Sequence, residues 1–109
     1  MNDTEFHNQI DLILRRVEHY IEALTDEFDL DSDFNRSGNV LTLDFGQAGK
    51  LILNSQPAAH ELWLAAKLGG FHYSFKNGQW FNQRDNISFN EHFVQILSAQ
   101  IGKTCPPIH

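Results

Sequence analysis

The residues most suited to chemistry in this chain are carboxylates crowded into one short tract. Between positions 18 and 33, with no Lys or Arg among them, lie half of the 14 acidic residues: Glu18, Glu22, Asp26, Glu27, Asp29, Asp31 and Asp33. Carboxylate oxygens bind hard cations such as Ca²⁺, Mn²⁺, Fe²⁺ and Fe³⁺. They also steer a basic partner surface into position. The tract therefore indicates weak cation binding, docking of a basic protein, or both.

A third interpretation gives the tract no ligand at all. Charged residues on an edge strand discourage aggregation, and many charge runs are simply solvated surface. An EF-hand is excluded because no Gly supplies the sharp turn of that loop. Any metal site here would be open and loose rather than a preformed cage.

The elements that position these carboxylates follow from their spacing. Glu18, Glu22 and Asp26 recur every four residues, so they share one face of a helix. The stretch EFDLDSDF at 27–34 alternates polar and apolar residues, which predicts a half-buried strand with its aspartates on the open face. Helix and strand would then form one continuous acidic ridge.

Two helices are predicted, one at each end of the chain. Apolar residues recur at spacings of three and four from Phe6 to Leu24 and again from Phe89 to Ile101. Asn2 with Glu5 and Ser88 with Glu91 have the spacing of capping boxes, and Gly102 is a helix stop.

The region between the helices alternates with period two in short segments. Strands are predicted at 27–34, 40–45, 50–56, 60–66, 71–76 and 79–82, with the hairpin signal Asn77-Gly78 before the last. In all but the last, one parity is apolar and the other largely polar. We therefore expect a single α+β domain over 1–109, a two-layer sandwich with both terminal helices on one face of an antiparallel sheet of five to six strands.

Composition narrows the function classes. A net charge of −6 disfavours nucleic acid as a partner, and no run of about 18 apolar residues could span a membrane. The single Cys105, in a C-terminal segment expected to fray, excludes an internal disulfide and suits the cytoplasm. No catalytic motif is present, so a non-enzymatic protein is expected. His72 and His92 are interpreted as solvent-facing or structural residues.

Two smaller groups of residues are candidate sites. Trp63 falls on the open-face parity near Asn54 and Gln56, which is typical of a binding hot spot, or else it packs on Ile52. Asp3 and His7 stand four residues apart on the first helix and could share a metal ion.

The order of these features resembles the frataxin family in its bacterial form. The resemblance rests on the acidic helix and strand, on GNVLTLDF, and on NSQPAAHELWLAAKLGGFHYSF, and it covers nearly the whole chain. In that pattern Asn54, Gln56 and Trp63 match a sheet-surface motif, although Pro57 follows Gln56 one residue early.

The resemblance implies a function beyond what spacing shows. It implies weak binding of Fe²⁺ and Fe³⁺ on the ridge, and a role in iron–sulfur cluster assembly as an iron-dependent regulator and candidate iron donor. The implied partners are a cysteine desulfurase on the ridge and its scaffold protein at Asn54, Gln56 and Trp63. Asp3 and His7 match positions that take other divalent metals in bacterial members. The protein would be mainly a monomer with iron-driven oligomers. The alternative is a ferroxidase and iron store acting through oligomers.

Overall fold

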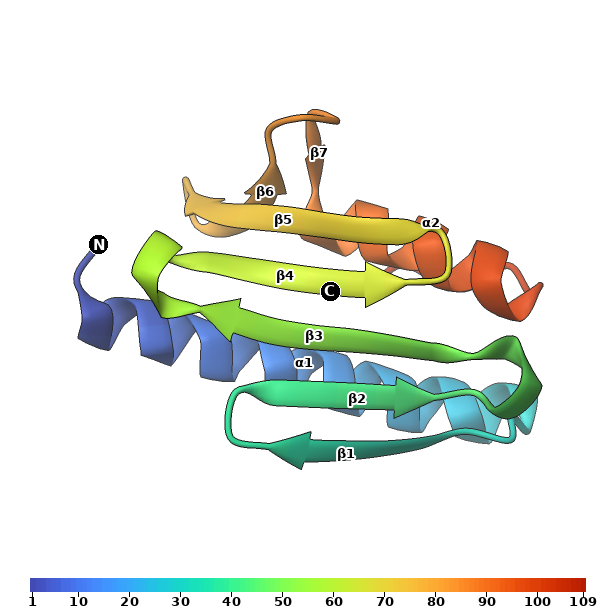
Figure 1. Ribbon diagram of the computed structural model, residues 1–109. Helices are drawn as coiled ribbons and strands as arrows, with labels where there is room; N and C mark the ends of the chain where they lie inside the picture. The colour runs from blue at the N-terminus through green and yellow to red at the C-terminus, as the bar shows by residue number, and fades with distance from the viewer.

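The computed structural model describes residues 1–109 and has two layers, with both helices on one face of an antiparallel sheet (Figure 1). Helix α1 (Asp3–Phe28) begins the fold and α2 (Phe89–Ile101) follows the last strand. Seven strands lie side by side in chain order: β1 (Asp33–Ser37), β2 (Val40–Asp44), β3 (Lys50–Gln56), β4 (Glu61–Ala66), β5 (Gly69–Lys76), β6 (Gln79–Asn82) and β7 (Ile87–Ser88). The predicted fold class is confirmed. The strand beyond the predicted five to six is β7, only two residues long.

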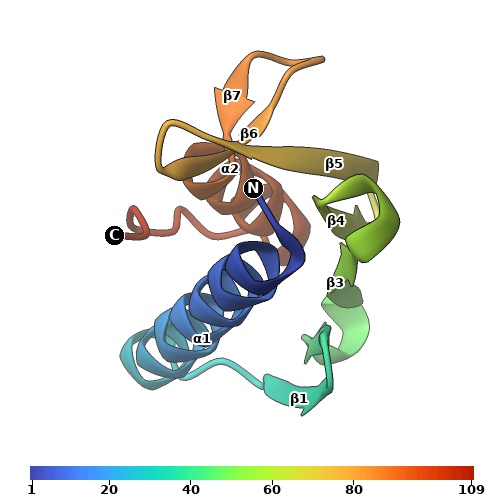
Figure 2. The ribbon, with the colours of Figure 1, turned by 90° about the vertical axis from the view of Figure 1, so that its left-hand side faces the viewer.

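The inner face of the sheet and the facing stripes of the two helices form one core. The sheet contributes Leu41, Leu43, Leu51, Leu53, Leu62, Leu64 and Tyr73, none more than 1% exposed. Burying a side chain of this size stabilises the fold by about 1.5–3 kcal/mol. Figure 2 shows the sheet curving around the helices, which explains how only two helices cover so many strands.

The predicted helix boundaries are confirmed at three of the four ends. Asn2 Oδ1 accepts from the Glu5 N–H at 2.8 Å and Ser88 Oγ from the Glu91 N–H at 3.3 Å. Gly102, with φ of 71°, ends α2 in the left-handed conformation. These local signals fix where each helix begins and where α2 ends.

The fourth end differs, and the strand predicted at 27–34 is wrong. Helix α1 continues to Phe28, Asp29 takes the left-handed conformation (φ 52°), and the backbone N–H of Leu30 donates to the carbonyl of Thr25. Only Asp33 of the three aspartates lies on β1. The alternating pattern of 27–34 led to a wrong strand prediction because Phe28 and Leu30 both contact the core, Phe28 from the last turn of α1 and Leu30 from the connecting loop.

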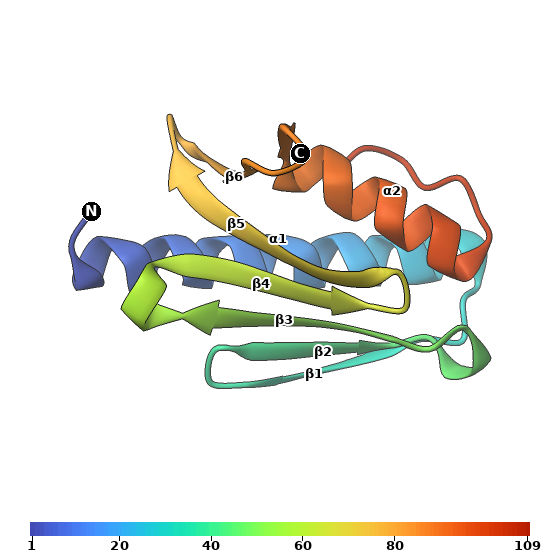
Figure 3. The same cartoon turned by 45° about the horizontal axis from the view of Figure 1, so that its top comes forward.

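The expectation of a frayed C-terminal tail is also wrong. Residues 103–109 turn back from the end of α2 and lie on the side of the helices away from the sheet (Figures 2 and 3). Cys105 and Ile108 are each 6% exposed and belong to the core. The Tyr20 hydroxyl donates to the carbonyl of Pro106 at 2.6 Å. Two apolar side chains and this hydrogen bond hold the segment in place.

One buried polar pair interrupts the apolar core. The Tyr73 hydroxyl and His92 Nδ1 are 2.6 Å apart. Burial lowers the pKa of His92, with the charge of Asp85 opposing it, and burial raises the pKa of Tyr73. At neutral pH the phenol therefore keeps its proton and donates to a neutral imidazole. The interpretation of His92 as a hydrogen-bonded structural residue is confirmed.

This pair predicts a pH dependence of stability. Because the pKa of His92 is lower in the folded state than the ~6.5 of an unfolded chain, the unfolded state takes up the proton first. The free energy of unfolding should therefore fall as the pH decreases from 7 to about 5. Urea unfolding of His92→Gln should show a shallower pH slope, whereas His72→Gln should keep the parent slope. Equal slopes in all three proteins would contradict this assignment.

Candidate functional site: an acidic ridge and an open sheet face

The acidic ridge, defined as the seven acids from Glu18 to Asp33, spans three elements rather than a helix and a strand. Glu22 and Asp26 project from α1 and border a hollow of about 210 Å³ together with Thr25, Ser32 and Phe34. The hydroxyls of Thr25 and Ser32 hydrogen-bond to each other at 2.5 Å. This hollow therefore offers two carboxylates and two hydroxyl oxygens, the donor types that hard cations accept.

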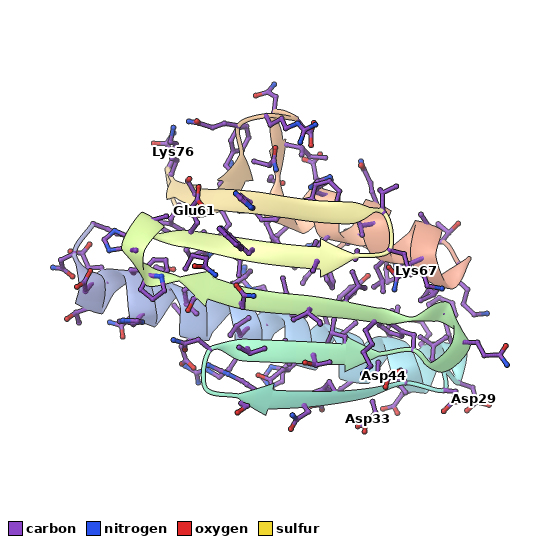
Figure 4. The ribbon with its side chains drawn as sticks, viewed as in Figure 1. Asp29, Asp33, Asp44, Glu61, Lys67 and Lys76 are labelled. Carbon is purple, nitrogen blue, oxygen red and sulfur yellow. The ribbon has the colours of Figure 1, made fainter.

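The remaining aspartates of the ridge gather where α1 passes into the sheet. Asp29 ends α1, Asp31 lies in the connecting loop, and Asp33 begins β1. Figure 4 shows Asp29, Asp33 and Asp44 at one end of the open face. Asp31 also reaches toward the β2–β3 connection, since its Oδ2 lies 3.7 Å from where a Cβ on Gly46 would stand.

Asp44 is a member of this cluster that the sequence analysis missed. It lies directly opposite Asp33 in the β1–β2 register, and its Oδ1 accepts from the backbone N–H of Gly46 at 2.9 Å. Like charges directly opposite each other on neighbouring strands are destabilising. The sequence did indicate that Asp44 lies on the open face, because its parity is that of the polar residues. Its pairing with Asp33 could not be predicted, because the first strand was assigned to 27–34 instead of 33–37 and the β1–β2 register was therefore unknown.

Glu18 differs from the rest of the ridge because it already has a partner. Arg36 of β1 points toward α1 and donates to Asp11 Oδ1 at 2.7 Å and to Glu18 Oε1 at 3.4 Å. The hydrogen bond from Arg36 lowers the pKa of Asp11. Glu18 therefore joins the edge strand to the helix at the end of the ridge.

The ridge is not a preformed metal cage. Nowhere in the structure do three His, Cys, Asp or Glu side chains come together in a way that could hold a metal ion. An open, loose cation site on the ridge stays a prediction. A cation on the ridge would keep much of its water.

Asp3 is hydrogen-bonded to His60, and no hydrogen bond or ion pair joins it to His7 four residues along the helix. Asp3 Oδ1 lies 2.8 Å from His60 Nε2, and this hydrogen bond lowers the pKa of Asp3. The His60 ring stacks on Phe6 with centroids 4.9 Å apart. Sequence reasoning missed His60, which lies 57 positions away and reaches α1 only through the turn after Pro57.

The open face carries the second candidate site. Asn54 lies opposite Trp63 and Gln56 opposite Glu61 in the β3–β4 register, so the predicted neighbourhood is confirmed. Gln56 Nε2 donates to Asn54 Oδ1 at 3.3 Å. Pro57 begins the short turn Pro57–Ala59, and Gln56 remains the last residue of β3. The early position of Pro57 therefore does not disturb the pairing of Gln56 with Glu61.

Trp63 is held in a fixed orientation on this face. Its ring stacks on His72 with centroids 4.2 Å apart and planes 1° from parallel, and its Nε1 donates to Glu61 Oε1 at 3.0 Å. Ile52 lies opposite Ala65 in the register and is thus a diagonal neighbour of Trp63 on the same face, so packing of Trp63 on Ile52 stays a prediction. Beyond His72 lies a polar hollow of about 260 Å³, lined in part by Glu61 and Arg84. Trp63 thus presents an oriented aromatic surface beside a concave one.

The fold has counterparts among solved structures. Frataxin from Psychromonas ingrahamii superimposes with a TM-score of 0.81 at 32% identity over 96% of each chain. Trimeric frataxin from the yeast Saccharomyces cerevisiae, complexed with ferrous iron, gives a TM-score of 0.74 at 25% identity over 86% of each chain. The architecture is thus the one that frataxins adopt.

Sequence comparison gives the same family. The family model of the frataxin-like domain matches residues 1–104. The iron–sulfur cluster assembly protein CyaY of Shewanella sp. (strain ANA-3) is 42% identical over 102 residues, and that of Shewanella baltica (strain OS155 / ATCC BAA-1091) is 37% identical; each alignment covers 94% of both chains. The chain belongs to the frataxin family. None of its helices has the length and apolar character needed to cross a bilayer.

The Asp33–Asp44 pair predicts how the ridge responds to cations. In the presence of a chelator, Asp33→Asn should raise the free energy of unfolding by about 0.2–1 kcal/mol, because it removes a like-charge pair, keeps the Oδ1 acceptor for the Phe34 N–H and leaves Asp44 opposite Lys50. The same change should reduce the rise in melting temperature that millimolar Ca²⁺ produces by binding the folded state.

Thermal unfolding with and without Ca²⁺ measures both effects. Asp85→Asn is the matched control, since Asp85 lies in the turn between β6 and β7, outside the ridge, and should leave the Ca²⁺ response unchanged. An Asp33→Asn variant that is less stable in chelator and responds fully to Ca²⁺ would contradict both the repulsion and the cation site.

Proposed function

We propose that this chain is a non-enzymatic iron-binding protein of iron–sulfur cluster assembly that docks on a cysteine desulfurase and its scaffold protein. Membership of the frataxin family and the assembly role named for the Shewanella relatives support the pathway. The observation that carries the proposal is the run of carboxylates that continues from α1 through the loop to β1 and β2. We also expect it to act in the cytoplasm.

Iron would bind as cargo on oxygen ligands of the ridge. We expect iron at two places. The hollow beside Glu22 and Asp26 has no basic residue in its lining, and Asp33 lies opposite Asp44, which also has Lys50 opposite it on β3. Open carboxylate sites for hard cations have dissociation constants from about micromolar to millimolar. Glu27 and Asp29 would add to the negative potential of the ridge. Glu18 would contribute mainly by holding Arg36, and with it the edge strand, against α1. A yeast frataxin complexed with ferrous iron supports this choice of metal.

The desulfurase would dock on the same ridge through its basic surface. A charge stripe of this length raises the association rate and fixes orientation more than it adds affinity. If iron and desulfurase share carboxylates, each changes the affinity for the other by the same factor. That reciprocity would make the protein an iron-dependent regulator and allow it to deliver iron at the complex.

The scaffold protein would contact the open face at Asn54, Gln56 and Trp63. An aromatic ring already fixed by stacking and a hydrogen bond loses little freedom on binding, which is typical of interface hot spots. The polar amides beside it supply orientation. Asn54, Gln56 and Trp63 lie on β3 and β4, whereas the ridge lies on α1, the loop and the edge strand β1, so the two partners could bind together.

A second candidate is an oligomeric iron store with ferroxidase activity. The trimeric state of the yeast relative is the observation that favours it. We place the monomer first and expect oligomers only when iron is added. Iron-dependent oxygen consumption with turnover, lost on substitution of ridge residues, would favour the store instead.

Charge reversal tests the docking proposal. Asp31→Lys with Asp33→Lys should weaken binding to a bacterial cysteine desulfurase by about tenfold or more at low salt, and less at high salt. Trp63→Ala should leave desulfurase affinity unchanged and weaken binding to the scaffold protein. Biolayer interferometry with immobilised desulfurase or scaffold measures both affinities.

The matched control changes net charge equally, away from the ridge. Glu5→Lys with Asp85→Lys replaces two exposed acids at the start of α1 and in the β6–β7 turn. If this control weakens desulfurase binding as much as the ridge variant, only net charge matters and the ridge is not the docking surface.

A further inference from the structure

Two adjacent arginines stand out on the outer face of α1 in this acidic chain. Arg15 and Arg16 are the only neighbouring pair among its eight Lys and Arg residues. They border a groove of about 510 Å³ between α1 and the C-terminal tail. No acidic side chain lines this groove; its walls include Leu12, Arg15, Arg16 and His19 from α1, and Pro107 and His109 from the tail.

The groove is a fixed part of the fold. Two contacts anchor the tail wall of the groove. The Tyr20 hydroxyl donates a hydrogen bond to the Pro106 carbonyl, and the side chain of Ile108 is buried in the core. The α1 wall belongs to the longest helix, whose inner stripe is fully packed. Its shape therefore does not depend on a mobile segment.

The charge balance at this groove is positive. Arg16 has no carboxylate within ion-pair distance, while Arg15 pairs with Asp11 at 2.7 Å and stays 58% exposed. The same Asp11 carboxylate also accepts from Arg36, but Arg36 has Glu18 as a second partner, so Asp11 balances the charge of Arg15. The excess positive charge at the groove is therefore that of Arg16.

We propose that this groove binds an organic polycarboxylate. Guanidinium groups form paired hydrogen bonds with planar carboxylates, and two adjacent ones suit a ligand with at least two such groups. Leu12, 51% exposed, and Pro107 offer an apolar wall for a carbon skeleton, which favours an organic acid over inorganic phosphate. The volume falls within the ~300–1,000 Å³ typical of small-molecule sites. The site differs in charge and place from the acidic ridge, and it does not rest on the proposed function.

A titration of the metal-free protein with citrate, followed by amide NMR, tests the proposal. We expect shifts confined to residues 12–20 and 106–109, with a dissociation constant of about millimolar or tighter. Arg16→Gln should weaken citrate binding about tenfold while leaving the melting temperature near that of the parent, since Arg16 makes no ion pair.

Two comparisons make the test specific. Arg84→Gln removes the same charge from the β6–β7 turn and should leave citrate affinity unchanged. Pyrophosphate, matched in charge, should bind at least about fivefold more weakly. Absence of shifts at these residues, an equal loss in Arg84→Gln, or equal affinity for pyrophosphate would overturn the proposal.

Discussion

The two helices bury their apolar stripes against the same face of the sheet, and this contact leaves the opposite face without a covering layer. Every strand from β2 to β5 must therefore present side chains to water on one parity while the other parity faces the helices and carries the buried core residues. The open face is the only broad surface of the sheet available to a partner. Trp63, Asn54 and Gln56 lie on this face because the alternate residues of β3 and β4 point toward the helices.

Helix α1 divides into faces of different character, and Arg36 marks the border at the edge of the sheet. The inner face is apolar, the face beside β1 carries the acids of the ridge, and the face beside the tail carries Arg15 and Arg16. By engaging Asp11 and Glu18, Arg36 fixes the edge strand to the helix and leaves the acids beyond it without basic partners. One helix can thus present opposite charges to different ligands.

Unpaired carboxylates have a cost that the fold tolerates. Asp33 and Asp44 lie opposite each other on neighbouring strands, a pairing that repulsion disfavours. Lys50 lies opposite Asp44 on β3, whereas Asp33 on the edge strand has no basic residue opposite it, and residues that break a local rule in this way are often functional. A cation or a basic partner would relieve this repulsion, which gives the ridge a physical reason to bind either.

Much of the fold was predictable from short-range signals in the sequence. The capping residues Asn2 and Ser88 and the parity of the central strands identified both helix starts and the buried face, because each acts within a few residues. The end of α1 was not predictable in this way. Phe28 and Leu30 satisfy a strand pattern and a helix end equally well, and only packing distinguishes the two.

The site was predictable in composition but not in pairing. The ridge acids were identified as a group, whereas Asp44, His60 and Arg36 enter through contacts between residues far apart in the chain. Such contacts depend on strand register and on the path of turns, which no local pattern specifies. The buried tail was missed for the same reason, since Ile108 reaches the core only when both helices are in place.

An anaerobic titration with Fe²⁺, followed by amide NMR with Mg²⁺ as the control and a bacterial cysteine desulfurase added last, tests the central claim most directly. We expect Fe²⁺ to broaden the signals of residues 22–33 and of Asp44, and the desulfurase to alter the same set. Small shifts spread over the whole chain and equal to those with Mg²⁺ would contradict iron binding on the ridge.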